Sequence, residues 1–559
     1  MIAARNNDAF KSVLDQAEAE LKAGRTAEAG TLLLQAGRQT DDQTASDLRE
    51  RYGHLDKDQR TVRELNEIFE ERWMISRSDI RLDNARAKRR YPDLFQRYDI
   101  SVGHEPAALS VERIRRSLIA ETLSNAMAEW FFVDPKSPGL LAVVDLLDPE
   151  PNRATLRAAI ANGDNDRVNE IGKTIDAARL APAYAIGLGE YCSDGVRILK
   201  SAWKTHPDSF PLALTISIRS PKYDKDTSTE AVGWARIAIA LRPDNALSHY
   251  YLALALNDNG FANNGQIAEE LRRAIQLAPR FAKAYGQLAK ILREDRNPEA
   301  VDIARKAIEL DHNNVFGHVV ILMEFLAKKE YTEAAKVYRQ LMSIKLDYNG
   351  DEHFEAGYTM GVLSVAIDVI HDGLIRVGRP FEAYSLFLEG ASGGSVSTNG
   401  HPDDDSSYKP ARAAALAGTG QGLDAPSPAE RPAIRKHALE WLTSRLDIWK
   451  KHATAVPVGA TSIVGLLNSP FGDGPFLVAS AFLAREIDLS AERARNCEVV
   501  HKRMKEWLSD PDLVRLRDDQ WLAKLPADER EQWRKFWAGV RYLRDRTASA
   551  EATLPNQGK

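Results

Sequence analysis

The densest group of side chains that could bind a metal ion lies at His401, Asp403, Asp404 and Asp405. Imidazole and carboxylate groups are ligands of divalent cations, but this run lacks the glycine and the distal glutamate of a calcium-binding loop. We favour a solvated loop over a metal site.

The glycines of Gly418–Gly422 superficially resemble a nucleotide-binding loop, yet they follow an alanine-rich helical segment and not a strand. A helix end and a turn are the favoured interpretation, so neither a cofactor nor a metal is expected.

Phosphoryl transfer is the other chemistry for which the sequence contains some of the required residue types. Residues 469–474 (SPFGDG) contain the residues of the magnesium-binding Asp-Phe-Gly motif of protein kinases, but in the wrong order. A kinase also needs a glycine-rich loop followed by a strand lysine, and a His-Arg-Asp loop, and the sequence has neither. No nucleophilic triad, metal cluster or pair of carboxylates takes their place. We therefore expect no catalytic residues and no enzymatic activity.

The composition is that of a folded chain with balanced charge. The 559 residues are 44% apolar, with 75 basic and 80 acidic side chains. This near-balance argues against nucleic acid as the main partner, because phosphate binding requires a concentrated basic face. Only two cysteines, Cys192 and Cys497, are present, which fits a reducing compartment. The first residues contain no apolar run, and the apolar stretches 453–467 and 475–484 are too short to cross a bilayer. We expect a cytoplasmic protein without a membrane span.

A repeat of about 34 residues organises the middle of the chain. The residues in equivalent places of successive helices are Ala202, Ala238, Ala274, Ala307 and Leu341, at steps of 36, 36, 33 and 34 residues. Pro207, Pro243 and Pro279 follow three of these helices, where proline blocks their continuation. Apolar side chains at i, i+3, i+4 and i+7 give each helix one buried face. This period is typical of tetratricopeptide repeats, so we predict an all-α fold: a tetratricopeptide-type helical-hairpin solenoid with flanking helical segments.

The repeat divides the chain into five expected segments. They are an N-terminal helical region at residues 1–179, a degenerate tetratricopeptide array at 180–390, a linker at 391–409, a C-terminal Trp-rich helical domain at 410–546 and a fraying tail at 547–559. The N-terminal region is predicted to contain a hairpin at 8–40, a charged helix at 56–90 and pre-array helices at 111–178. The tryptophans are expected to pack in the core, and His249 and His318 are expected to be partly buried packing residues. The basic run Arg86–Arg90 is interpreted as a solvated helix face, with an anionic partner as the less favoured alternative.

Several segments resemble one protein family. Residues 411–423 (ARAAALAGTGQGL), 438–449 (ALEWLTSRLDIW), 507–514 (WLSDPDLV) and 525–537 (LPADEREQWRKFW) are similar to the C-terminal signature of large multidomain bacterial serine/threonine protein kinases. Residues 113–157 are similar to the helices that precede the tetratricopeptide array of that family. The resemblance covers about residues 72–546, with 454–490 as an insertion. It implies a tetratricopeptide-containing tail without the kinase domain, and hence a role in signal transduction beside a kinase.

The inner face of the array is the expected binding surface, because stacked first helices line a groove. By the repeat register this face presents residues from three units: Tyr250, Leu254, Asn257, Asp258, Lys283, Lys290, Arg293, Phe316, Val319 and Met323. The mixture of apolar and basic side chains suggests an apolar peptide that carries an acidic group. A solvated groove without a dedicated ligand is the alternative.

Two hypotheses about function follow. The leading one is a non-catalytic interaction scaffold or adaptor that binds a protein or peptide partner in the groove. The alternative is a regulatory or sensory segment of a serine/threonine kinase system that works apart from its catalytic chain. The second rests on family resemblance alone, which is an analogy and not an argument from a site.

Overall fold

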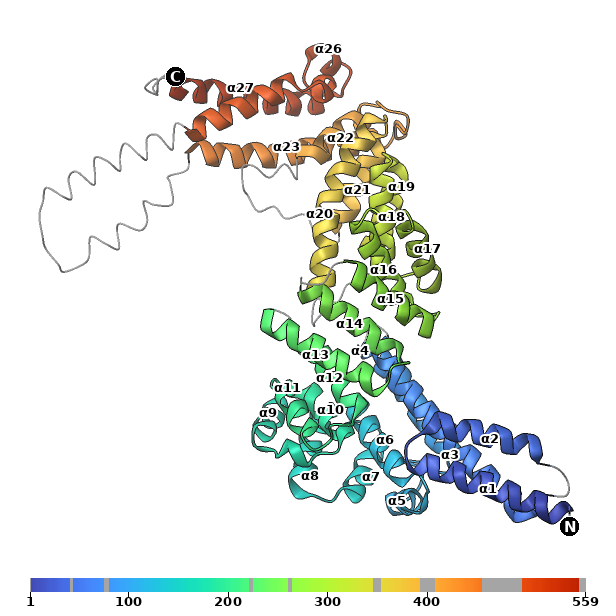
Figure 1. The fold of residues 1–559 in the computed structure, drawn as a ribbon. Helices are drawn as coiled ribbons and strands as arrows, with labels where there is room; N and C mark the ends of the chain where they lie inside the picture. Colours follow the sequence, from blue (N-terminus) through green and yellow to red (C-terminus); the bar gives the residue numbers. More distant parts are fainter. Residues whose placement is uncertain are drawn as a thin grey trace, which may run out of the picture. The chain divides into compact units, whose positions relative to one another are not determined.

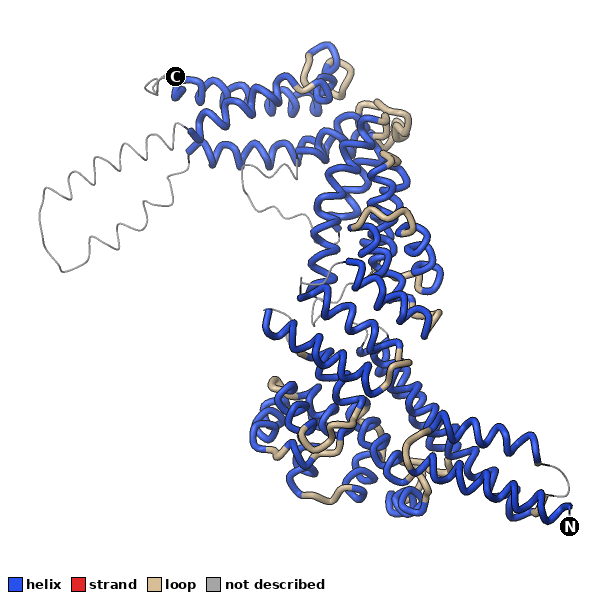
Figure 2. The backbone as a smooth tube through the Cα atoms, viewed as in Figure 1, coloured by secondary structure: helices blue, strands red, loops and turns tan. Residues whose placement is uncertain are grey.

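The computed structural model describes residues 2–40, 44–74, 80–220, 225–259, 264–344, 353–392, 408–454 and 495–551. Within these ranges every regular element is a helix (Figure 2). The predicted all-α, tetratricopeptide-type solenoid is confirmed. By their contacts the residues form two compact units, which we describe separately. The first unit is Met1–Val320 with Lys345–Tyr358, and the second is Ile321–Ile344 with Thr359–Lys559. The five segment limits expected from the sequence stay a prediction.

The helices before the array belong to the first unit. They are α1 (Ile2–Lys22), α2 (Thr26–Gln39), α3 (Ser46–Met74), α4 (Ile80–Arg97), α5 (Ala107–Arg116), α6 (Ala120–Val133), α7 (Leu140–Leu147), α8 (Pro151–Asn162) and α9 (Asn165–Thr174), followed by a 3₁₀ turn at Ala177–Arg179. Helices α1 and α2 pack as the predicted hairpin around Phe10, Leu14 and Leu33. Further along, Asn245 donates a hydrogen bond of 2.9 Å to the Glu70 carboxylate, which joins α3 to the array.

The prediction of one charged helix at 56–90 is wrong. This stretch contributes to two helices, α3 and α4, which pack against each other (Figure 1). Residues 75–79 between them lie outside the described residues. Many charges that suggested a solvated helix are paired across this hairpin: Arg90 forms ion pairs with Glu64 (3.5 Å) and Glu71 (2.8 Å). The apolar residues Leu65 and Phe95 are buried on the facing sides.

Buried charge ties α7 and α8 to the start of the array. Arg157 is fully buried, and its guanidinium forms ion pairs with Asp145 (2.6 Å) and Asp148 (2.9 Å). It also donates to the Asp148 carbonyl oxygen at 2.7 Å and lies 6.0 Å from the centre of the Tyr184 ring. Arg153 adds a further hydrogen bond of 2.7 Å to the Asp148 carboxylate. A buried guanidinium is stable only when its donors are satisfied, so these carboxylates hold it in place.

The Asp148 carboxylate should make the stability of the first unit depend on pH. Burial raises the pKa of this carboxyl, but hydrogen bonds and charge from Arg153 and Arg157 outweigh burial, so the pKa is below its ordinary value. Such a group stabilises the folded state above its unfolded pKa of about 3.9, and the contribution is lost as pH falls through the folded pKa. We expect Asp148→Asn to have a lower urea midpoint than the unmodified protein at pH 7, and the difference to shrink below about pH 4. An unchanged difference at the lower pH would contradict this role.

The array comprises six helix pairs along the sequence. They are α10 (Pro182–Tyr191) and α11 (Gly195–Trp203), α12 (Phe210–Arg219) and α13 (Lys225–Leu241), α14 (Ala246–Asn259) and α15 (Asn264–Leu277), α16 (Ala282–Glu294) and α17 (Ala300–Leu310), α18 (Val315–Ala327) and α19 (Tyr331–Ser343), and α20 (His353–Arg376) and α21 (Pro380–Ser392). The residues that set the repeat period are all buried: Ala202, Ala238, Ala274, Ala307 and Leu341. The small side chains at the four alanine positions let paired helices approach closely, as the period predicted.

The second unit continues after α21 with α22 (Tyr408–Gly418), α23 (Arg431–Thr454), a helix at 495–509, a 3₁₀ helix at Pro511–Leu516, α26 (Asp519–Leu522) and α27 (Ala527–Glu551). Its tryptophans Trp449, Trp507, Trp533 and Trp537 are buried, as expected of core residues. Helix α27 extends through Glu551, past the expected start of the tail, and Thr547 is buried in it. Most of the expected linker, 393–407, and residues 455–494, which include nearly all of the insertion at 454–490, lie outside the described residues.

The turn interpretation of Gly418–Gly422 is confirmed. Helix α22 ends at Gly418, and Gly420 and Gly422 have φ values of 73° and 101°, a region that favours glycine. The chain then returns to α21, where the Asp424 carboxylate accepts hydrogen bonds from the backbone N–H groups of Phe381 (3.2 Å) and Glu382 (2.7 Å). The glycines therefore form the turn that ends α22, and Asp424 after this turn caps the start of α21. The segment is not a phosphate-binding loop.

The candidate partner-binding groove

The first helices of three units, α14, α16 and α18, carry the residues predicted to line the groove. A repeated hydrogen bond fixes how each of them begins. It joins His249 Nε2 to the Pro243 carbonyl oxygen (3.0 Å), the Tyr285 hydroxyl to the Pro279 oxygen (3.3 Å) and His318 Nε2 to the His312 oxygen (2.8 Å). Each side chain thus returns to the turn six residues before it. His249 and His318 are buried, which confirms their packing role, but this bond was not foreseen.

Neighbouring first helices also approach closely at a second polar contact. Asn314 donates to the Ala282 carbonyl oxygen at 3.1 Å and accepts from the backbone N–H of Gly317 at 2.9 Å. A side chain at Gly286 would place its Cβ only 2.3 Å from the Asn314 amide oxygen. The start of α18 is therefore held against α16, and a larger residue at position 286 would force the Asn314 side chain to shift from these bonds. Between α14 and α16, the rings of Tyr250 and Phe281 are 4.8 Å apart.

The predicted groove residues differ in exposure. Four are buried: Tyr250, Lys290, Phe316 and Val319. Five are partly exposed: Leu254, Asn257, Lys283, Arg293 and Met323. Met323 belongs to the second unit, whereas the others belong to the first, and the side chain of Asp258 is outside what the structure describes. The surface that the first unit offers to a partner is therefore centred on the four remaining partly exposed residues.

Lys290 is not an open cationic group. Its side chain is 6% exposed, and its ammonium lies 2.9 Å from the Glu294 carboxylate. The same ammonium lies 5.2 Å from the centre of the Tyr358 ring. Since its charge is already balanced within the first unit, Lys290 cannot be the residue that attracts an acidic partner. Lys283 and Arg293 are the other basic residues of the predicted set, and both are partly exposed.

Tyr358 is the residue of this site that the sequence did not indicate. It lies in the N-terminal part of α20, with its ring centre 6.0 Å from that of Phe316. Helix α20 begins at His353 and is 24 residues long, whereas the preceding first helix α18 has 13 residues. The apolar periodicity of residues 358–366 was the available signal. This periodicity could have predicted that the helix begins early enough to contact α16 and α18.

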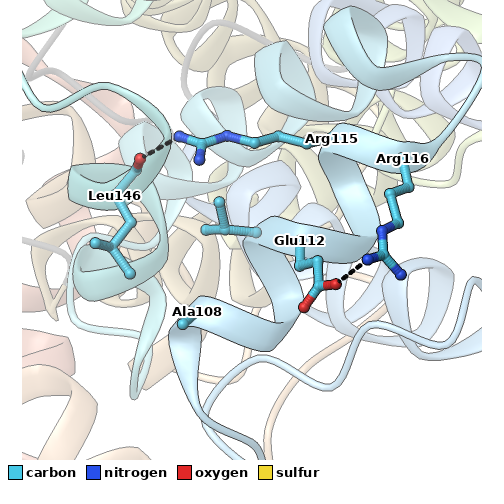
Figure 3. A pocket seen from close by; sticks show the side chains of 6 residues that line it. Ala108, Glu112, Arg115, Arg116 and Leu146 are labelled. Carbon is cyan, nitrogen blue, oxygen red and sulfur yellow. Dashed lines mark hydrogen bonds and ion pairs between the residues drawn. The ribbon is translucent and has the colours of Figure 1, made fainter.

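Figure 3 shows a separate hollow between α5 and α7. Its volume is about 340 Å³, and its lining residues are Ala108, Val111, Glu112, Arg115, Arg116 and Leu146. Arg115 donates to the Leu146 carbonyl oxygen at 2.9 Å, and Arg116 forms an ion pair of 2.5 Å with Glu112. Both guanidinium groups thus already have partners at the mouth of this hollow.

Two other expectations concern sites elsewhere. Among the described residues, no group of three or more His, Cys, Asp or Glu is placed to hold a metal ion, and the His401–Asp405 run lies outside them. One described stretch, Tyr358–Arg376, has the length and apolar composition of a membrane-crossing helix. A core helix passes the same test, and Leu363, Ile370 and Leu374 are buried. In the basic run, Arg86 and Arg89 are exposed, and Arg90 is paired as described above.

No protein-family model matches the sequence, and no curated protein matches it. Solved structures with similar helical arrangements include a crystal structure of MamA, with 19% identity over 29% of this chain and 90% of that one, and a TM-score of 0.24. The APC/C hetero-tetramer Cut9-Hcn1 has 13% identity over 83% and 85%, with a TM-score of 0.33. The human IFIT1 dimer with PPP-AAAA has 14% identity over 86% and 96%, with a TM-score of 0.26. At these scores the similarities establish neither a family nor a function.

Proposed function

We propose that this chain is a non-catalytic interaction scaffold that binds a peptide segment of a partner protein along α14 and α16. The observation that carries the proposal is the register of the first helices. The repeated bonds from His249, Tyr285 and His318 begin each helix in the same way, so successive helices present equivalent positions to one surface. Stacked helical hairpins in this arrangement provide an extended, preformed binding face.

The partly exposed residues indicate what such a segment would contain. Leu254 offers apolar contact, Asn257 offers an amide, and Lys283 offers a positive charge. An aliphatic side chain followed by an acidic group would satisfy all three, because burial of apolar area supplies affinity and charge supplies orientation. We place this activity in the cytoplasm as part of the same proposal.

Substitutions on the surface formed by α14 and α16 are expected to abolish partner binding. The variant Leu254→Arg with Lys283→Glu should reduce capture of specific proteins from native cells by at least tenfold in proximity labelling with the full chain. Arg305→Glu is the matched control, since Arg305 is exposed on α17 and its ion pair with Asp302 is at the surface. Proteins that the control captures and the double variant loses are the partners. Identical captured sets for both variants would contradict the proposal.

A role beside a serine/threonine kinase is a second proposal, and it rests on the resemblance of residues 411–423, 438–449, 507–514 and 525–537. If it holds, a kinase that lacks such a tail should be encoded next to this chain and should appear among the proteins lost by the double variant. A captured set without any kinase would count against this proposal and leave the scaffold proposal standing.

A further inference from the structure

The N-terminal part of α20 lies on the surface that the groove residues form. Helix α20 has 24 residues, whereas the equivalent first helix α18 has 13. The additional turns precede the paired part of α20, and by its contacts the segment Lys345–Tyr358 belongs to the first unit and not to the second. Tyr358 is the described residue through which this segment reaches both α16 and α18.

The contacts of Tyr358 resemble those of a bound side chain. On one side its ring meets the Phe316 ring at 6.0 Å between centres, tilted by 53°. On the other, the Lys290 ammonium lies 5.2 Å from its centre, within the range of a cation–π contact. Lys290 and Phe316 are two of the predicted groove residues, and both are buried. The Tyr358 ring therefore covers Lys290 and Phe316, two residues that the repeat register predicted to contact a ligand.

The ion pair between Lys290 and Glu294 favours a neutral ring, and not an acidic group, at the position of Tyr358. Glu294 already forms an ion pair with Lys290 at 2.9 Å, so a second carboxylate here would be repelled. Burial raises the pKa of the Tyr358 phenol, and the charge of Glu294 raises it further, so the ring stays uncharged at neutral pH. The face of an aromatic ring is attracted by the ammonium without competing for the carboxylate.

We propose that Tyr358 is an internal ligand of the groove, and that the partner segment carries an aromatic residue which replaces it over Lys290 and against Phe316. This inference rests on the proposed function and specifies its ligand: an aromatic side chain at the α16–α18 end of the site. In the free chain the Tyr358 ring occupies this place in the groove. A partner must compete with it, and because Tyr358 is part of the same chain its effective concentration is high.

A synthetic peptide from the chain itself provides the probe. Fluorescein-labelled peptide HFEAGYTMGVL, which has the sequence of residues 353–363, is titrated with the full-length protein and followed by fluorescence anisotropy. Tyr358→Ala should bind the peptide at least tenfold more tightly than the unmodified protein, because the groove is vacated. Adding Phe316→Ala to Tyr358→Ala should weaken binding at least fivefold. The peptide with its tyrosine replaced by alanine should not bind either protein.

Tyr542→Ala is the matched control, since Tyr542 is an exposed tyrosine of α27 in the second unit. It should bind the peptide as weakly as the unmodified protein does. Equal binding to the unmodified protein and Tyr358→Ala, or binding to neither, overturns the internal-ligand inference. That outcome leaves the scaffold proposal to be judged by the Leu254→Arg and Lys283→Glu capture experiment, so the two failures are distinguishable.

Discussion

Replacing Gly195 by alanine is expected to destabilise the first unit by about 3 kcal/mol or more, near the upper end for an overpacked core. The added Cβ would lie 2.1 Å from the carbonyl oxygen of Gly189, which is backbone of α10. A side chain could rotate away, but a helix backbone cannot. Helices α10 and α11 would have to separate, which would loosen Leu199 and Ala202, both fully buried. The measurement is the urea midpoint of α10 and α11 peptides in pulsed hydrogen exchange.

Gly233→Ala is the matched control for this prediction. Gly233 is an exposed glycine inside α13, and no atom lies within 4 Å of the Cβ that alanine would add. Alanine costs less backbone entropy than glycine in a helix, so this variant is expected to be more stable by roughly 0.5–1 kcal/mol. If Gly195→Ala proved as stable as Gly233→Ala, the close crossing of α10 and α11 would be wrong.

Arg157→Met is expected to cost about 3 kcal/mol in the same unit. Methionine keeps much of the length of the side chain but removes a charge that is fully buried and paired with Asp145 and Asp148. Those carboxylates are partly exposed, so water recovers some of the lost interaction and the cost stays below that of a fully enclosed pair. The midpoint of urea-induced unfolding, followed through exchange of α7, α8 and α10, gives the change.

The control for Arg157→Met is Arg167→Met on the neighbouring helix α9. Arg167 is 53% exposed, and its ion pair with Glu170 is at the surface. Surface pairs contribute about 0–1 kcal/mol, so this variant should be close to the unmodified protein. Comparable losses for both arginines would show that Arg157 is not a buried link between α7, α8 and α10.

The array was predictable because its cause is local and periodic. A small residue must recur wherever two paired helices touch, so Ala202, Ala238, Ala274 and Ala307 could be recognised without any structure, and all four are buried. The hairpin of α3 and α4 was not predictable by the same means. Its helices are held by pairs such as Arg90 with Glu71, which are separated in sequence, and the charges alone suggested solvent.

The position of the partner-binding groove stays a prediction, but the contacts of its predicted residues can be compared with the sequence. The register placed Lys290 on the inner face, and the structure places its ammonium between Glu294 and the Tyr358 ring. The Glu294 partner was readable, because lysine and glutamate four residues apart lie on one face of a helix. Tyr358 was not, because its contacts depend on the length of α20 and on packing against two helices distant in sequence. Single-sequence periodicity carries no information about such contacts.

Hydrogen exchange of the captured complex is the most direct test of the central claim that the inner face of the repeats binds a partner. The full chain is isolated with a protein lost by the Leu254→Arg and Lys283→Glu variant, and exchange is compared with the free chain. Our account predicts slower exchange in α14 and α16 on binding. Protection confined to the second helices α15 and α17, with α14 and α16 unchanged, would contradict it.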